Sequence, residues 1–156
     1  DRWERSAHGP RTVAAPAPSP WPAIDALCAL DRAATGLDRR VLLADFLSRP
    51  GTRVWQGDDG RGFVIARDGR RATQIGPLVA SDERHAAGLL DAAIAAASDA
   101  GRPVFLDLPR ERRQVAERLE RQGFVRQRPF VRMSLGASEA PRLGAGLFVL
   151  AGPEFG

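Results

Sequence analysis

The chain of 156 residues contains no lysine, no asparagine, no tyrosine and only one cysteine, Cys28. A single cysteine excludes an internal disulfide and leaves no Cys/His cluster for zinc, so we expect no metal site. Without lysine or tyrosine, the chain has neither a Schiff-base amine nor a phenolic proton donor. No apolar run approaches the roughly 20 residues that cross a bilayer, so we expect a cytoplasmic protein without a membrane partner.

All 23 basic residues are arginines, and 19 acidic residues reduce the formal net charge to +4. Lysine, asparagine and tyrosine share A/T-rich codons. A GC-rich, bacterial genome therefore explains the arginine excess better than a nucleic-acid partner does. Hydrophobic residues make up 44% of the chain, close to the average for a globular protein, and at this length they can build one domain core without cross-links.

Residues 1–22 are rich in proline and alanine, which is typical of an extended linker, with a short strand expected only at 11–15. Residues 23–156 carry the periodic patterns of a folded domain. We expect one helix that begins at residue 22 and ends before Gly36, and a second that has Asp38 as its cap and ends before Pro50. Two more are expected at 82–100 and 110–122. We expect strands at 52–56, 61–67, 70–80, 103–108, 124–134 and 147–151. The strand–helix–strand unit at 73–108 predicts one parallel crossover.

Four short segments and the order of these elements carry a resemblance. The segments are GLDRRVLL at 36–43, IGPLVA at 75–80, RPFVRM at 128–133 and AGPEFG at 151–156, and Gly123-Phe124 follows an amphipathic helix. The chain resembles the GNAT superfamily of acyl-CoA N-acyltransferases and, more narrowly, the C-terminal half of bacterial two-domain GNAT proteins. The resemblance implies an α/β (α+β) fold with a mixed, mostly antiparallel sheet of six to seven strands, one central parallel pair, and helices on both faces.

The resemblance also implies transfer of an acetyl group from acetyl-CoA to an amine. In that superfamily the donor wedges between the two parallel strands where they splay apart, and the next helix points its N-terminus at the pyrophosphate. Free N–H groups and the helix dipole favour an anion there. The residues implied at the acyl carbonyl and pantetheine are Leu78, Val79 and Ala80. Those implied at the pyrophosphate lie within 81–86 and include Ser81, Arg84, His85 and Ala86.

Two departures from the family pattern bear on activity. Arg84 stands where the phosphate loop has its first glycine, and Asp82 and Glu83 add negative charge beside it. Leu119 stands where many relatives have a tyrosine that protonates the departing thiolate. A proton donor would then have to be Cys28, His85, a carboxylate or water.

Two carboxylates are candidate catalytic groups. Asp107 ends the predicted parallel strand, where ligands of open sheets bind, but it could instead cap a helix or pair with an arginine. Glu154 follows Gly152-Pro153 and could act as a base or hold the acceptor amine, or simply lie in a surface turn. Both alternatives stay open for each residue.

Two functions follow from these observations. The first is an N-acetyltransferase acting on a small-molecule or peptide amine beside another GNAT domain N-terminal to this segment. The second is a GNAT-like domain that has lost the chemistry and supports a catalytic neighbour, senses a ligand or mediates an interaction. A homodimer is compatible with either function.

Overall fold

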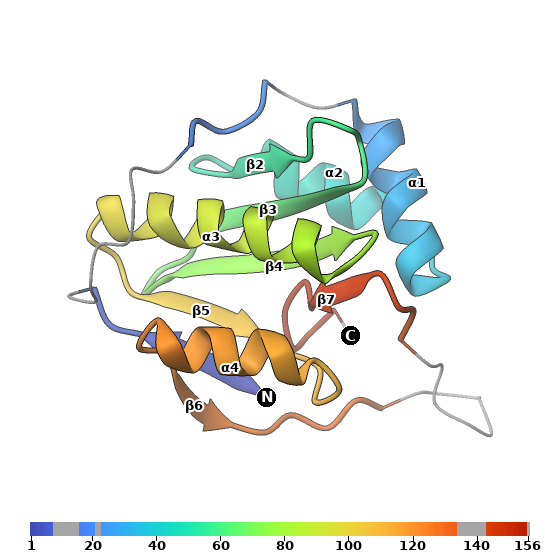
Figure 1. The fold of residues 1–156 in the computed structure, drawn as a ribbon. Helices are drawn as coiled ribbons and strands as arrows, with labels where there is room; N and C mark the ends of the chain where they lie inside the picture. The colour runs from blue at the N-terminus through green and yellow to red at the C-terminus, as the bar shows by residue number, and fades with distance from the viewer. Residues whose placement is uncertain (8–15, 21–22, 134–142, 156) are drawn as a thin grey trace.

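The computed structural model describes residues 1–7, 16–20, 23–133 and 143–155, and it folds them into one twisted sheet flanked by helices (Figure 1). The strands are β1 (Arg2–Arg5), β2 (Arg53–Gln56), β3 (Gly62–Asp68), β4 (Thr73–Ala80), β5 (Val104–Asp107), β6 (Val125–Arg128) and β7 (Leu147–Val149). The helices are α1 (Ile24–Thr35), α2 (Arg40–Ser48), α3 (Glu83–Asp99) and α4 (Arg113–Arg121).

The sheet is mixed and mostly antiparallel, as predicted. Its strand order is β2-β3-β4-β5-β1-β6, and β7 pairs with β4 off this path. Among the described residues, β4 and β5 form the one parallel pair, with Thr73 opposite Val104 and Ile75 opposite Leu106. Helix α3 connects these two strands, so the predicted parallel crossover is confirmed.

Two hydrophobic clusters lie on opposite faces of the sheet. On one face, the larger cluster joins the sheet to α3 and α4 through side chains such as Leu90, Ile94 and Leu119. On the other, Leu27 of α1 and Phe46 of α2 pack against β3, β4 and β7. Figure 1 shows α3 and α4 in front of the sheet, with α2 behind it. Helices therefore cover both faces, as the fold class requires.

The N-terminal stretch predicted as linker contains a strand inside the sheet, next to the edge strand β6. Strand β1 lies between β5 and β6 and is antiparallel to both. Trp3 is only 4% exposed and belongs to the larger cluster. The linker prediction is wrong for Arg2–Arg5, because proline and alanine further along the stretch dominated its composition. The strand expected at 11–15 lies outside the described residues.

The helices follow the predicted pattern with small shifts at their ends. Gly36 ends α1 in the left-handed conformation (φ 72°), as expected for a helix C-terminus. The helix expected at 82–100 begins at Glu83 with Asp82 as its cap, and β6 ends at Arg128 rather than at residue 134. No helix in the described part of the chain combines the length and apolarity needed to cross a membrane.

Candidate functional site

Strands β4 and β5 separate at the point where the sequence predicts a donor slot. They pair in parallel only as far as Ile75 and Leu106. Gly76 and Pro77 then form a bulge in β4, so the pairing with β3 resumes at Leu78. Beyond the bulge β4 bends away from β5, and the predicted splay between the two strands is present.

Strand β7 lies inside this gap (Figure 1). It runs antiparallel to β4, with Val149 opposite Leu78 and Leu147 opposite Val79. On the other side, the Leu150 N–H donates to the carbonyl oxygen of Asp107 at 2.9 Å. The chain therefore closes the gap between β4 and β5 with its own backbone.

The pairing extends to the last residue of β4 and leaves the inserted side chains buried. The Ala80 N–H donates to the carbonyl oxygen of Gly146 at 3.0 Å. All three residues of β7 are at most 1% exposed. Consequently the three residues predicted to contact the donor, Leu78, Val79 and Ala80, lie on a strand edge that is already hydrogen-bonded.

Arg112 and Gly76 fit the inserted strand closely. The Arg112 guanidinium donates to the carbonyl oxygens of Leu147 (2.9 Å), Gly144 (3.2 Å) and Ala145 (2.5 Å), and it lies 4.3 Å from the centre of the Phe148 ring. At Gly76 φ is 139°, and a Cβ there would collide with the carbonyl oxygen of Leu150. The hydrogen bonds from Arg112 and the close approach of Leu150 to Gly76 therefore hold β7 in place, in addition to its pairing with β4.

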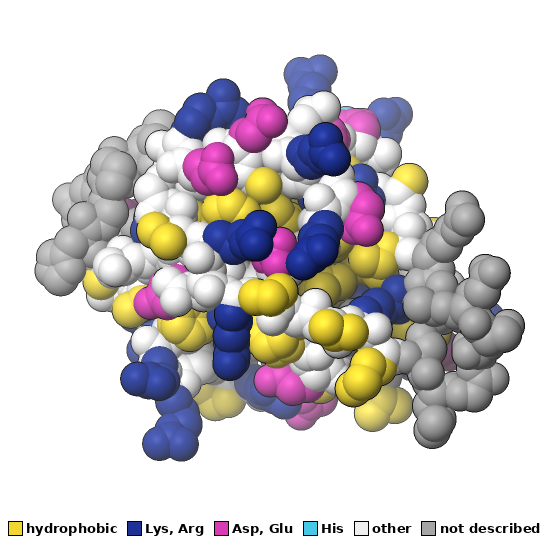
Figure 2. Space-filling model, turned by 90° about the horizontal axis from the view of Figure 1, so that it is seen from below, with side chains coloured by type: hydrophobic (Ala, Val, Ile, Leu, Met, Phe, Trp, Pro, Cys, Tyr) yellow, Lys and Arg dark blue, Asp and Glu magenta, His cyan; other side chains and the backbone are white. Residues whose placement is uncertain are grey.

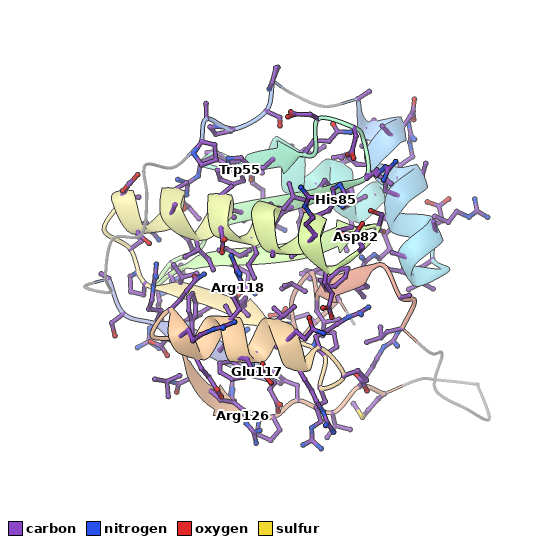
Figure 3. The ribbon with its side chains drawn as sticks, viewed as in Figure 1. Trp55, Asp82, His85, Glu117, Arg118 and Arg126 are labelled. Carbon is purple, nitrogen blue, oxygen red and sulfur yellow. The ribbon has the colours of Figure 1, made fainter. Side chains whose placement is uncertain are left out.

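At the N-terminus of α3, the structure places a carboxylate of the chain itself. The Asp82 carboxylate accepts a hydrogen bond from the His85 N–H at 3.0 Å and so caps the helix. The His85 ring lies between Asp82 Oδ2 (2.7 Å) and Asp59 Oδ2 (3.0 Å), the latter on the turn between β2 and β3. Figure 3 shows Asp82 and His85 together at this end of the helix.

These contacts shift the acid–base behaviour of both partners. Hydrogen bonds from the His85 backbone and ring lower the pKa of Asp82 well below its usual range. The hydrogen bond to Asp82 raises the pKa of His85, and Asp59 adds to the effect. The end of α3 where a pyrophosphate was predicted therefore carries a capping carboxylate that stays ionised.

The two candidate carboxylates occupy different environments. Asp107 is 1% exposed and accepts from Arg2 Nε and Nη2, each at 3.0 Å, and from Gln74 Nε2 at 3.0 Å. These contacts correspond to the arginine-pairing alternative. Glu154 is exposed and lies in the turn that follows β7.

The buried Arg67 side chain experiences the charges of both carboxylates. Burial, together with the charge of Arg49, lowers the pKa of Arg67 to about 10, and the charges of Glu154 and Asp107 act in the opposite direction. Arg67 stacks 3.7 Å from the centre of the Phe46 ring and donates to the carbonyl oxygen of Ala151. It therefore holds the segment that follows β7 against α2. The catalytic and donor-binding roles of the predicted residues stay predictions.

The most consequential residues of this site were not predicted from sequence. The segment at 147–151 was expected to be a strand, but no local pattern indicates that its partner is β4. Arg112 lies in a run of charged residues, and the sequence does not distinguish it from a solvent-exposed residue at the start of a helix. Leu119, the counterpart of the missing tyrosine, is fully buried in the core.

The comparisons with known proteins agree with this architecture. A model of the acetyltransferase (GNAT) domain matches residues 27–148. No curated protein matches the chain. A solved structure from Pyrococcus horikoshii, assigned as an acetyltransferase, superimposes with a TM-score of 0.68 at 20% identity over 99% of this chain, which shows a shared fold. The chain covers 50% of that protein's chain. Because the family model spans most of its length and the sheet has the expected topology, the chain belongs to the GNAT acetyltransferase family.

Proposed function

We propose that this chain is a GNAT domain that serves an acetyltransferase without holding the acetyl donor in the slot between β4 and β5. The observation that carries the proposal is β7, whose backbone pairs with β4 across the length where the family binds pantetheine. A donor could use that edge only after β7 had left it.

The residues of the slot do not fit acetyl-CoA as they are arranged. A pantetheine arm needs free N–H and C=O groups on β4, yet Ala80 N–H bonds to Gly146 and the register pairs Leu78 with Val149. The side chains of Phe148 and Val149 are also packed into the core of the domain. With β7 in place, the slot therefore offers no free backbone edge to a pantetheine arm.

The N-terminus of α3, where the family binds the pyrophosphate, also disfavours acetyl-CoA. The Asp82 carboxylate accepts from the backbone at the start of α3, where the family binds phosphate oxygens. Because the pKa of Asp82 is lowered, a negative charge stays there at neutral pH and repels a second anion. The nearby His85 ring is already shared between the carboxylates of Asp82 and Asp59.

The difference in length between this chain and its structural relative supports a role beside another domain. This chain spans about half the length of the related Pyrococcus protein. We propose that a second GNAT domain, N-terminal to this segment in a longer cytoplasmic protein, binds acetyl-CoA and acetylates a small-molecule or peptide amine. In this arrangement the present domain supports that neighbour and need not form a homodimer.

A second candidate is acetyl transfer from acetyl-CoA to an amine by this chain itself, with Glu154 or Asp107 as the base. The match to the acetyltransferase family supports it. It requires β7 to move aside and, where Asp107 is the base, Asp107 to leave its bonds with Arg2 and Gln74.

Titration of the whole chain with acetyl-CoA separates the two candidates. Calorimetry and amide NMR spectra should detect no saturable binding at millimolar donor, with the amide signals of 78–86 unmoved. Saturable binding that shifts those signals would refute the proposal. Amine acetylation by the purified chain that is sensitive to Glu154→Gln would establish the second candidate.

A further inference from the structure

Strand β6 forms an edge of the sheet that the described part of the chain leaves open. The strand order ends at β2 on one side and at β6 on the other. At the β2 edge the chain covers itself, because the Ser19 N–H donates to the carbonyl oxygen of Val54 and the Gln56 N–H donates to Ser19 Oγ, each at 2.9 Å. No described residue pairs in this way with the outer edge of β6, which lies at the bottom of the sheet in Figure 1.

Large apolar side chains are exposed along this edge and along the segment that continues it. Val125 is 61% exposed, Val131 83% and Met133 88%, and all four residues of β6 are exposed. Figure 2 looks at the molecule from the β6 side and shows hydrophobic side chains gathered beside arginines. Apolar side chains that lie together on a surface mark interaction sites, and an open edge offers backbone donors and acceptors to a further strand.

The charged side chains of the same segment are all positive. Residues 125–133 (VRQRPFVRM) contain three arginines and no acidic residue. The Arg126 side chain is 57% exposed, and its Nη1 lies 3.7 Å from the carboxylate of Asp1. Arg128 is exposed and stacks 4.9 Å from the centre of the Phe130 ring, and no carboxylate of the described residues pairs with it. The edge therefore presents positive charge beside its apolar side chains.

The sign of this charge determines which strand the edge can accept. Like charges on paired strands are destabilising, and opposite charges are stabilising. A second copy of the chain would set the arginines of one β6 against those of the other, with no acid in either segment to compensate. Arginines therefore protect the edge against self-association and leave it open to a strand of opposite charge.

We propose that the outer edge of β6 binds an extended acidic strand of a partner protein. The partner adds itself to the sheet through backbone hydrogen bonds, its carboxylates lie beside Arg126 and Arg128, and its apolar side chains cover Val125. The inference goes beyond the proposed function, since it concerns the opposite side of β1 from the β4–β5 slot and holds whether or not acetyl-CoA binds there.

Titration of the whole chain with the end-blocked peptide EVEVEVE tests the edge. We expect saturable binding that slows hydrogen exchange in Val125–Arg128 and leaves exchange in the covered strand β2 unchanged. The peptide KVKVKVK reverses the charge and should bind at least about tenfold more weakly. The peptide EVEPEVE keeps the four glutamates but interrupts the backbone ladder with proline, and its affinity should fall by at least about tenfold as well.

Charge variants locate the peptide on β6. Arg128→Glu replaces an attraction by a repulsion, so it should weaken EVEVEVE about fivefold or more and strengthen KVKVKVK. Arg70→Glu is the matched control, because it changes the net charge equally at an exposed position in the turn between β3 and β4. It should alter either affinity by less than about twofold, since charges this far apart are screened by salt.

Four results would overturn the inference. They are the absence of saturable binding of EVEVEVE, equal affinity for EVEVEVE and KVKVKVK, slowed exchange at a place other than β6, and equal effects of Arg128→Glu and Arg70→Glu. The first three use the unaltered chain, so they decide the matter even if Arg128→Glu fails to fold. In sedimentation, a dimer that Val125→Arg dissociates would identify a second copy as the occupant and would also refute the acidic strand.

Discussion

Among single residues, His85 makes the stability of the start of α3 depend on pH. Its pKa is raised and that of Asp82 is lowered, so both are charged in the pH interval between the two values. The stabilisation they give the folded chain is lost as pH rises through the pKa of His85, and again as pH falls through that of Asp82.

An NMR titration of the imidazole signals checks this. We expect the pKa of His85 to lie above its ordinary value of about 6.5, and Asp82→Asn to bring it down. Asparagine also caps helices well, so this variant removes the charge but keeps the cap. A His85 pKa that did not respond to Asp82→Asn would show that the ring is solvated rather than bridged.

Asp107 gives a second prediction for a single side chain. Its buried pair with Arg2 predicts that Asp107→Asn lowers the free energy of unfolding by about 3 kcal/mol, because an unpaired cation remains. Glu154→Gln is the matched control, and its exposed position predicts a change within about 0.5 kcal/mol. Urea denaturation of both variants measures the difference. Equal stabilities would contradict a structural role for Asp107.

Among the elements, β7 fills the gap beside β4, and a substitution at Gly76 tests how closely the β7 segment packs there. Gly76→Ala puts a Cβ against Leu150 in a backbone conformation that suits glycine. We expect it to lower the free energy of unfolding by more than about 1 kcal/mol and to speed hydrogen exchange in β7.

Gly88→Ala is the matched control for this change. Gly88 lies inside α3, and the Cβ that alanine adds there would meet no atom within 4 Å, so this variant should stabilise the chain by about 0.5–1 kcal/mol. If both variants were stabilised, β7 would not be packed against Gly76 as described.

The elements also show what sequence can and cannot predict. Long periodic stretches such as α3, and the β4–α3–β5 unit, follow from local patterns and were correctly predicted. Strand β1 was missed because four residues carry too little alternation. Strand partners far apart in the chain, such as Val79 and Leu147, depend on packing that no local pattern encodes.

The same limit applies to the candidate site. Leu78, Val79 and Ala80 were placed on the right strand, yet what faces that strand is set by residues almost 70 positions later. The negative charge at the start of α3 was visible in the sequence. Its effect, a carboxylate seated in the cap, required the geometry of Asp82 and His85.

For the whole molecule, the position of β1 predicts one cooperative unit. Trp3 packs in the core between α3, α4 and the sheet, so Trp3→Ala should lower the free energy of unfolding by about 3–5 kcal/mol. Met133→Ala, at an 88% exposed position, should change it by less than about 0.5 kcal/mol. Thermal unfolding followed by circular dichroism and by tryptophan fluorescence should coincide. Separate transitions would mean that β1 is not integral to the sheet.

The pairing of β1 and β7, the first and last strands along the chain, has a consequence for biosynthesis. Strand β5 pairs with β1 across about a hundred residues of chain, and β4 acquires its last neighbour only when Leu147–Val149 has been made. Pairings this distant form slowly. A nascent chain leaving the ribosome would therefore expose an unfinished sheet edge until that segment emerges, and in that interval it would be most vulnerable to aggregation and most dependent on chaperones.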